Sequence, residues 1–68
     1  MKAISGKRLC KLVELQGWKL RRINGSHYIY AREGERANLS VPVHGNRTLR
    51  QGTQRKLMRL AGISEAEL

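Results

Sequence analysis

The N-terminal hydrophobic positions repeat with the period of an α-helix. The residues on the i, i+3, i+4, i+7 spacing are Leu9, Leu12, Val13 and Gln16. Ser5 is a favoured N-cap residue, and Gly17 favours the left-handed conformation that ends many helices. The pattern therefore predicts a helix from Ser5 to about Gln16, followed directly by a turn.

An alternating pattern, typical of strands, follows this helix. Within residues 18–23, Trp18 and Leu20 fall on one face and basic side chains on the other. The pair Asn24-Gly25 is a strong signal for a two-residue hairpin turn. We therefore expect two antiparallel strands, at residues 18–23 and 26–32, with Trp18 in the core.

The clearest alternation along the chain lies between residues 37 and 44. One expected face consists of Ala37, Leu39, Val41 and Val43. The other expected face consists of Asn38, Ser40, Pro42 and His44. Pro42 has no backbone N–H to donate, so this third strand is expected at the edge of the sheet.

A second amphipathic segment begins near Thr53 and ends at Gly62. Its core-facing positions are Leu57, Leu60 and Ala61. The sequence Ser64-Glu65-Ala66-Glu67 has the form of a capping box and predicts a third helix just before the chain ends. The expected fold is thus a single α+β domain over residues 1–68, in which two helices pack on one face of a three-stranded antiparallel sheet.

The charge of the chain indicates which kind of partner it binds. Fourteen Lys and Arg stand against five Asp and Glu, and the formal net charge is +9. The segment from Arg36 to Ser64, both included, contains six basic residues and no acid. Such a surface favours nucleic acid as the partner, although a merely solubilising role remains the simpler alternative.

The remaining composition bears on where the protein works. The single cysteine, Cys10, excludes an internal disulfide, favours a reducing compartment and is best interpreted as a small packing residue. No apolar run approaches the ~18 residues of a membrane span, and no signal-peptide pattern opens the chain. We therefore expect a cytoplasmic protein.

The stretch Gly25-Ser26-His27 carries the chief candidate for chemistry. An RNA substrate brings its own nucleophile, the 2′-OH, so an enzyme needs mainly a proton-transfer group and cations around the phosphate. A histidine can supply that group near neutral pH. The alternative is a packing residue, because His27 alternates with Ile29 and leans toward the core if Ile29 faces the helices.

An ordered set of short motifs is spread over nearly the whole chain. The motifs are Gly17-Trp18, Gly25-Ser26-His27, Val41-Pro42-Val43-His44, Gly52-Thr53, Arg55-Lys56-Leu57 and Ala61-Gly62-Ile63-Ser64. In this order and spacing the set resembles the HicA toxins of bacterial and archaeal toxin–antitoxin modules. The resemblance implies a fold like the double-stranded-RNA-binding domain and ribosome-independent cleavage of mRNA without a required metal. It further implies that His27 is catalytic and that a HicB antitoxin inhibits the protein. The C-terminus is shorter than in many relatives of this family.

Further side chains are candidates for contacting RNA. Ser26 leaves room for a backbone to approach, and Tyr28 and Tyr30 could stack on bases or could cover the core. The basic candidates for phosphate contacts are Arg47, Arg50, Arg55, Lys56 and Arg59. The stripe formed by Arg55, Lys56 and Arg59 on the last helix is either a solvated face or a ridge that contacts phosphates, and the lack of acids to pair with these charges favours the ridge.

The candidate ligands for a metal have no recognised spacing, and we expect no cofactor. His44, at the end of an edge strand, is a weaker candidate for RNA contact. Two other interpretations stay open: a non-catalytic RNA-binding module that reads A-form shape, and an interaction protein that docks an acidic partner. We expect a monomer when free and a complex with an antitoxin.

Overall fold

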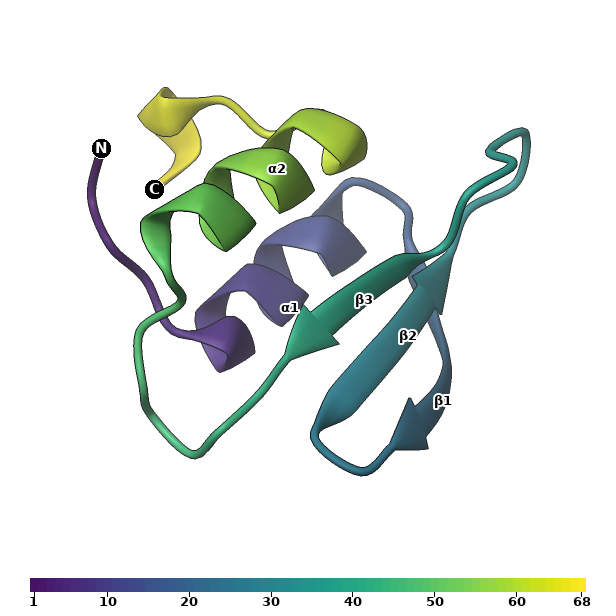
Figure 1. The fold of residues 1–68 in the computed structure, drawn as a ribbon. Helices are drawn as coiled ribbons and strands as arrows, with labels where there is room; N and C mark the ends of the chain where they lie inside the picture. Colours follow the sequence, from purple (N-terminus) through teal and green to yellow (C-terminus); the bar gives the residue numbers. More distant parts are fainter.

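The computed structural model describes all residues from Met1 to Leu68. Figure 1 shows two helices and a three-stranded sheet in the order α-β-β-β-α, which confirms the expected α+β fold. The elements are α1 (Gly6–Leu15), β1 (Lys19–Asn24), β2 (His27–Ala31), β3 (Leu39–Pro42), α2 (Gln51–Ala61) and a 3₁₀ turn (Glu65–Glu67).

Local capping sets the ends of the helices. The Ser5 side chain accepts a hydrogen bond from the Arg8 backbone N–H at 3.1 Å, which fixes the start of α1. At the end of α2, Gly62 adopts φ +78°, a left-handed conformation that glycine reaches without strain. The expected third helix is only a 3₁₀ turn, although its capping box between Ser64 and Glu67 is present.

The sheet is antiparallel in the order β1-β2-β3, and β3 with Pro42 lies at an edge as expected. Asn24 pairs with His27, so the hairpin turn consists of Gly25 and Ser26. The turn therefore comes one residue later than predicted, and Gly25, at φ +62°, takes the left-handed position in it.

A bulge in β1 overturns the simple alternation predicted for residues 18–23. Leu20 lies opposite Tyr30 and Arg22 lies opposite Ile29, so Arg21 is an extra residue in the ladder. Because directly opposed residues share a face, Leu20 and Ile23 project to the helix side of the sheet. Arg22 projects to the open side.

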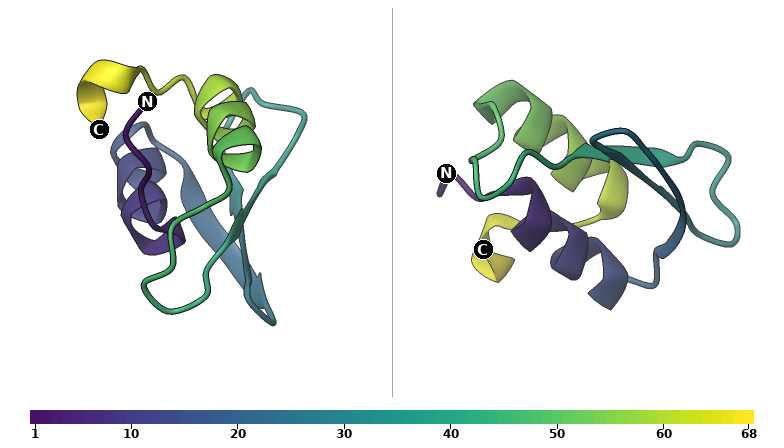
Figure 2. Two further views of the ribbon diagram at one scale, coloured as in Figure 1. Left: turned by 60° about the vertical axis from the view of Figure 1, so that its left-hand side comes forward. Right: turned by 90° about the horizontal axis from the view of Figure 1, so that it is seen from below.

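The tyrosines of β2, and not Ile29, face the helices. Tyr30 is 1% exposed, and its neighbours Leu39 and Val41 on β3 are equally buried. Both helices cover this one face of the sheet, as Figure 2 shows. His27, which alternates with Tyr28 and Tyr30, therefore faces the open side, and the alternative in which it leans toward the core is wrong.

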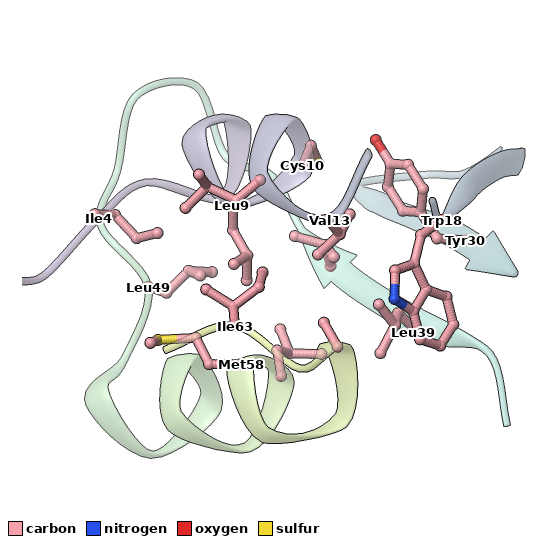
Figure 3. Packing of buried hydrophobic residues seen from close by; sticks show 14 residues of the cluster. Ile4, Leu9, Cys10, Val13, Trp18, Tyr30, Leu39, Leu49, Met58 and Ile63 are labelled. Carbon is pink, nitrogen blue, oxygen red and sulfur yellow. The ribbon is translucent and has the colours of Figure 1, made fainter. Parts of the chain in front are cut away.

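The core fills the space between the two helices and the covered face of the sheet (Figure 3). Cys10 and Trp18 belong to this cluster, as predicted from the sequence. Gln54 is the one fully buried polar side chain. Its amide donates to the Lys2 carbonyl at 2.7 Å and accepts from the Ile4 N–H at 3.0 Å, which attaches the N-terminal segment to α2.

The helices lie over β3 rather than over β1, so the hairpin projects beyond the helical layer (Figure 1). Every residue of β1 is exposed. At the opposite edge, α1 begins directly against the end of β3. The approach is so close that a Cβ on Gly6 would collide with the Pro42 carbonyl oxygen, so only glycine fits there. Neither helix has the length or apolar character that crossing a membrane requires.

Candidate functional site

His27 is the first residue of β2 and lies exposed on the open face of the sheet. The two-residue turn before it and its pairing with Pro42 on β3 fix its backbone. Its Nδ1 lies 3.2 Å from the Ser40 Oγ, whereas its Nε2 has no partner within the protein. The imidazole is thus oriented across the sheet by one hydrogen bond and presents a free nitrogen.

Three cations of β1 lie on the side of the sheet that carries His27. Arg22 projects there from its position opposite Ile29. Lys19 and Arg21 line one hollow together with Ala31, whose side chain shares the open face with His27. None of the three takes part in an ion pair, since the only pairs join Arg32 to Glu35 and the N-terminus to Glu65.

Two hollows continue the open face past β3 toward the start of α2. The first, about 310 Å³, lies between Ser40 and the side chains of Thr53 and Lys56. The second, about 280 Å³, is lined by Pro42, His44, Arg47, Thr48, Leu49, Arg50 and Thr53. Because Thr53 lines both, the surface is continuous from the histidine to Arg47 and Arg50. We call the open side of the sheet, together with these two hollows, the His27 face.

The basic stripe predicted on α2 is divided between two sides of the helix. Lys56 lies on the side of Ser40, whereas Arg55 and Arg59 line a separate hollow with Met1 and Glu65. The helical step separates neighbouring residues by about 100° around the axis, so Lys56 cannot share a side with Arg55. The expectation of one ridge without acids is therefore wrong.

The two tyrosines lie on the opposite side of the sheet from His27. Tyr30 donates a hydrogen bond to Glu14 Oε2 at 2.6 Å, and its burial, with Cys10 and Glu14 as neighbours, raises its pKa far above the usual value. Its ring has no face open to a base, so the core alternative holds for Tyr30. Tyr28 is half-buried and packs against the core.

Ser26 has a structural contact as well as a place beside the histidine. Its carbonyl accepts a hydrogen bond from the Val43 N–H at 2.7 Å, so it attaches the end of β3 to the hairpin turn. Through this bond and the pairing of His27 with Pro42, the second hollow stays next to the histidine.

Sequence reasoning missed four residues of the His27 face: Ser40, Lys19, Arg21 and Arg22. Ser40 was placed correctly with Pro42 on the polar side of its strand, but the sequence did not show that His27 shares that side. Lys19 and Arg21 were likewise placed on the polar side of their strand, without a sign that His27 shares that side. Arg22 was missed because no glycine or proline marks the bulge that turns it there.

The chemical groups of the His27 face are the imidazoles of His27 and His44, the hydroxyls of Ser40, Thr48 and Thr53, and several cations. No three His, Cys, Asp or Glu side chains cluster closely enough to hold a metal ion. A face of this kind can bind a polyanion, and its free imidazole nitrogen can accept or donate a proton.

The fold and this face define a class: a small, basic α+β protein with an exposed histidine on the uncovered, cationic side of its sheet. A family model described as the HicA toxin of bacterial toxin–antitoxin systems matches residues 6–63. The chain therefore belongs to the HicA toxin family, which supports a role as a toxin and implies an antitoxin as its partner. A search of curated proteins gives no match.

Proposed function

We propose that this toxin is an RNA endonuclease that cleaves mRNA, with His27 as the group that transfers protons. The observation that carries the proposal is the exposed imidazole, hydrogen-bonded to Ser40 through Nδ1, on a side of the sheet that also carries cations of β1 that form no ion pair. A histidine that served packing would be buried, whereas this side chain is exposed on the uncovered side of the sheet.

The proposed reaction uses the nucleophile that RNA contains. Nε2 of His27 takes the proton of a 2′-OH, and the 2′ oxygen attacks the adjacent phosphorus. The bond from phosphorus to the 5′ oxygen breaks, which leaves a 2′,3′-cyclic phosphate on one fragment. The departing 5′ oxygen receives a proton, either from the imidazolium formed in the first step or from water. The balance of atoms requires no metal or cofactor.

The cations have two tasks in this proposal. Those close to the histidine, Arg22 and Lys56 among them, stabilise the negative charge that develops on the phosphate. Those farther along the His27 face, Arg47 and Arg50, bind neighbouring phosphates and hold the strand in place. The first task affects the rate of cleavage, and the second affects affinity.

The test is cleavage of a labelled mRNA, in EDTA, by the wild type and by two variants. We expect His27→Ala and His27→Asn each to lower the cleavage rate by at least ~10²-fold, the scale of a general acid–base group. The Asn variant keeps a group that can hydrogen-bond to Ser40 but cannot exchange protons near neutral pH. Circular dichroism and RNA affinity should match those of the wild type.

Three results would count against this proposal. RNA binding without cleavage by the wild type would indicate the non-catalytic RNA-binding module instead. Cleavage by His27→Asn at the rate of the wild type would assign His27 a positional role. Loss of activity in proportion to loss of folded protein in the variants would assign His27 a role in the stability of the fold.

The partner expected from the resemblance completes the proposal. A HicB-like antitoxin would hold the toxin inactive, and the free toxin would be a monomer. The molar mass of the purified toxin by light scattering, alone and with the antitoxin encoded beside it, tests both statements.

A further inference from the structure

The largest hollow of the molecule lies on the side of the sheet opposite His27. It measures about 650 Å³ and separates α1 from the projecting β1–β2 hairpin. Leu20 and Tyr28 contribute its apolar lining, and Lys7, Arg8 and Lys11 of α1 contribute basic groups. The proposed RNA endonuclease activity uses none of these side chains.

Two aliphatic side chains stand exposed beside this hollow. Leu20 is 44% exposed and Ile23 is 52% exposed, and the bulge at Arg21 places both on the helix side of β1. The helices do not extend over β1, so nothing within the chain covers this pair. Exposed aliphatic groups side by side on a strand indicate contact with protein rather than with RNA, which stacks on aromatic rings.

The strand that carries these residues also forms a free edge of the sheet. β1 pairs only with β2, so the backbone groups on its outer side have no partner strand. Its side chains divide by face: Leu20 and Ile23 on the helix side, and Lys19, Arg21 and Arg22 on the open side. A strand added here would have its own side chains beside each of these two sets.

This division specifies the chemistry of the partner. Apolar side chains on the helix side would cover Leu20 and Ile23, with room in the hollow beneath them. Acidic side chains on the open side would meet the three unpaired cations. A second copy of this chain is a poor match, because pairing β1 with β1 would bring two sets of cations together.

We propose that the free edge of β1 docks a protein segment that is extended and alternates acidic with apolar residues. The docking adds a strand to the sheet beside β1 and does not depend on RNA cleavage. A segment bound in this way neutralises Lys19, Arg21 and Arg22 while it leaves His27 uncovered. If the proposed function holds, the segment competes with RNA through these cations alone.

The probe is a synthetic, end-capped peptide of alternating Glu and Val, long enough to pair with the whole of β1. Binding is measured by fluorescence anisotropy, and its place by NMR shifts of methyl groups. We expect the methyls of Leu20 and Ile23 to shift and the imidazole of His27 not to shift. A peptide of alternating Lys and Val, and a Glu-Val peptide with methylated backbone nitrogens, should each bind at least ~10-fold more weakly.

Two leucines of nearly equal exposure, one on β1 and one on α2, are each replaced by aspartate to test whether the peptide contacts β1. Leu20→Asp should weaken binding of the Glu-Val peptide at least ~10-fold, because it places an acid where an apolar side chain must pack. Leu60→Asp changes a leucine on α2 that is 43% exposed and should bind as the wild type does. Circular dichroism on both variants separates a lost contact from a lost fold.

Four results would overturn the inference. They are failure of the Glu-Val peptide to bind, equal binding of the Lys-Val peptide, equal effects of the two variants, and NMR shifts confined to other elements. Self-association that Leu20→Asp abolishes would assign the edge to a second copy. Shifts of the Leu20 and Ile23 methyls by a single-stranded RNA oligonucleotide would assign it to RNA.

Discussion

At the scale of single residues, the contact between His27 and Ser40 decides how the imidazole can act. Either nitrogen of a neutral imidazole can carry its proton. If Nδ1–H donates to the Ser40 hydroxyl, Nε2 keeps a free lone pair and can accept the proton of a 2′-OH. Ser40 is then a positioning residue, since it touches the histidine and not the substrate.

We predict that Ser40→Ala lowers kcat for RNA cleavage by roughly tenfold, the scale of one hydrogen bond, and leaves KM nearly unchanged. Ser40→Thr, which keeps the hydroxyl, should restore most of the rate. The nitrogen NMR shifts of His27 should show the Nδ1–H form in the wild type and a mixture of forms in Ser40→Ala. A wild type that already shows the mixture would contradict this role, whatever the rate of cleavage.

The sequence identified His27 as the chemical candidate but could not assign it to a face. Tyr28 with Tyr30, or Ile29 with Ala31, could have formed the buried side of β2. The tyrosine side is buried because the Tyr30 hydroxyl finds an acceptor in Glu14 on α1, so its polar tip costs little there. That partner is a tertiary contact, and no local pattern reveals it.

At the scale of elements, the bulge in β1 decides which side chains reach each face. Arg21 is the extra residue, with Leu20 opposite Tyr30 and Arg22 opposite Ile29. Without it the ladder would continue from Leu20 directly to Arg22, and all other pairs would keep their partners. The bulge therefore adds a cation to the open face without moving the register.

We predict that deletion of Arg21 leaves the fold and the hairpin register intact and changes the free energy of unfolding by about 1 kcal/mol or less. NOEs between Ile23 and Tyr28, and thermal melts, measure this. Deletion of Ile29 from the partner strand is the contrasting case. That strand has no extra residue, so Tyr28 would turn from the core to the open face and the protein should unfold. Equal tolerance of the two deletions would contradict the assignment of the bulge.

The elements differ in how far the sequence predicted them. Capping residues predicted the limits of α1 and the end of α2 within one or two residues, because a cap is a local contact between neighbours in the chain. The start of α2, at Gln51, was predicted two residues late, since its N-cap residue, Arg50, makes no side-chain cap bond. The side of α2 on which each cation lies depends on how the helix packs against β3, which is again tertiary.

At the scale of the whole molecule, the net charge of +9 attracts any polyanion, but only cations placed along its path bind its phosphates. Two pairs of arginines separate these effects. Arg47 and Arg50 line the hollow that continues the His27 face, whereas Arg55 and Arg59 lie on another side of α2 near Glu65. Replacing either pair with alanine lowers the net charge by the same amount.

We predict that Arg47→Ala with Arg50→Ala weakens binding of a single-stranded RNA oligonucleotide and flattens its salt dependence. The slope of log K against log salt should fall by about 1.4, since each phosphate contact to a single strand contributes about 0.7. Arg55→Ala with Arg59→Ala should change the slope far less. Both pairs are compared in the His27→Ala background so that the RNA stays intact. Equal changes in slope would mean that RNA responds only to the overall positive charge of the protein. The proposed path of RNA along the His27 face would then be wrong.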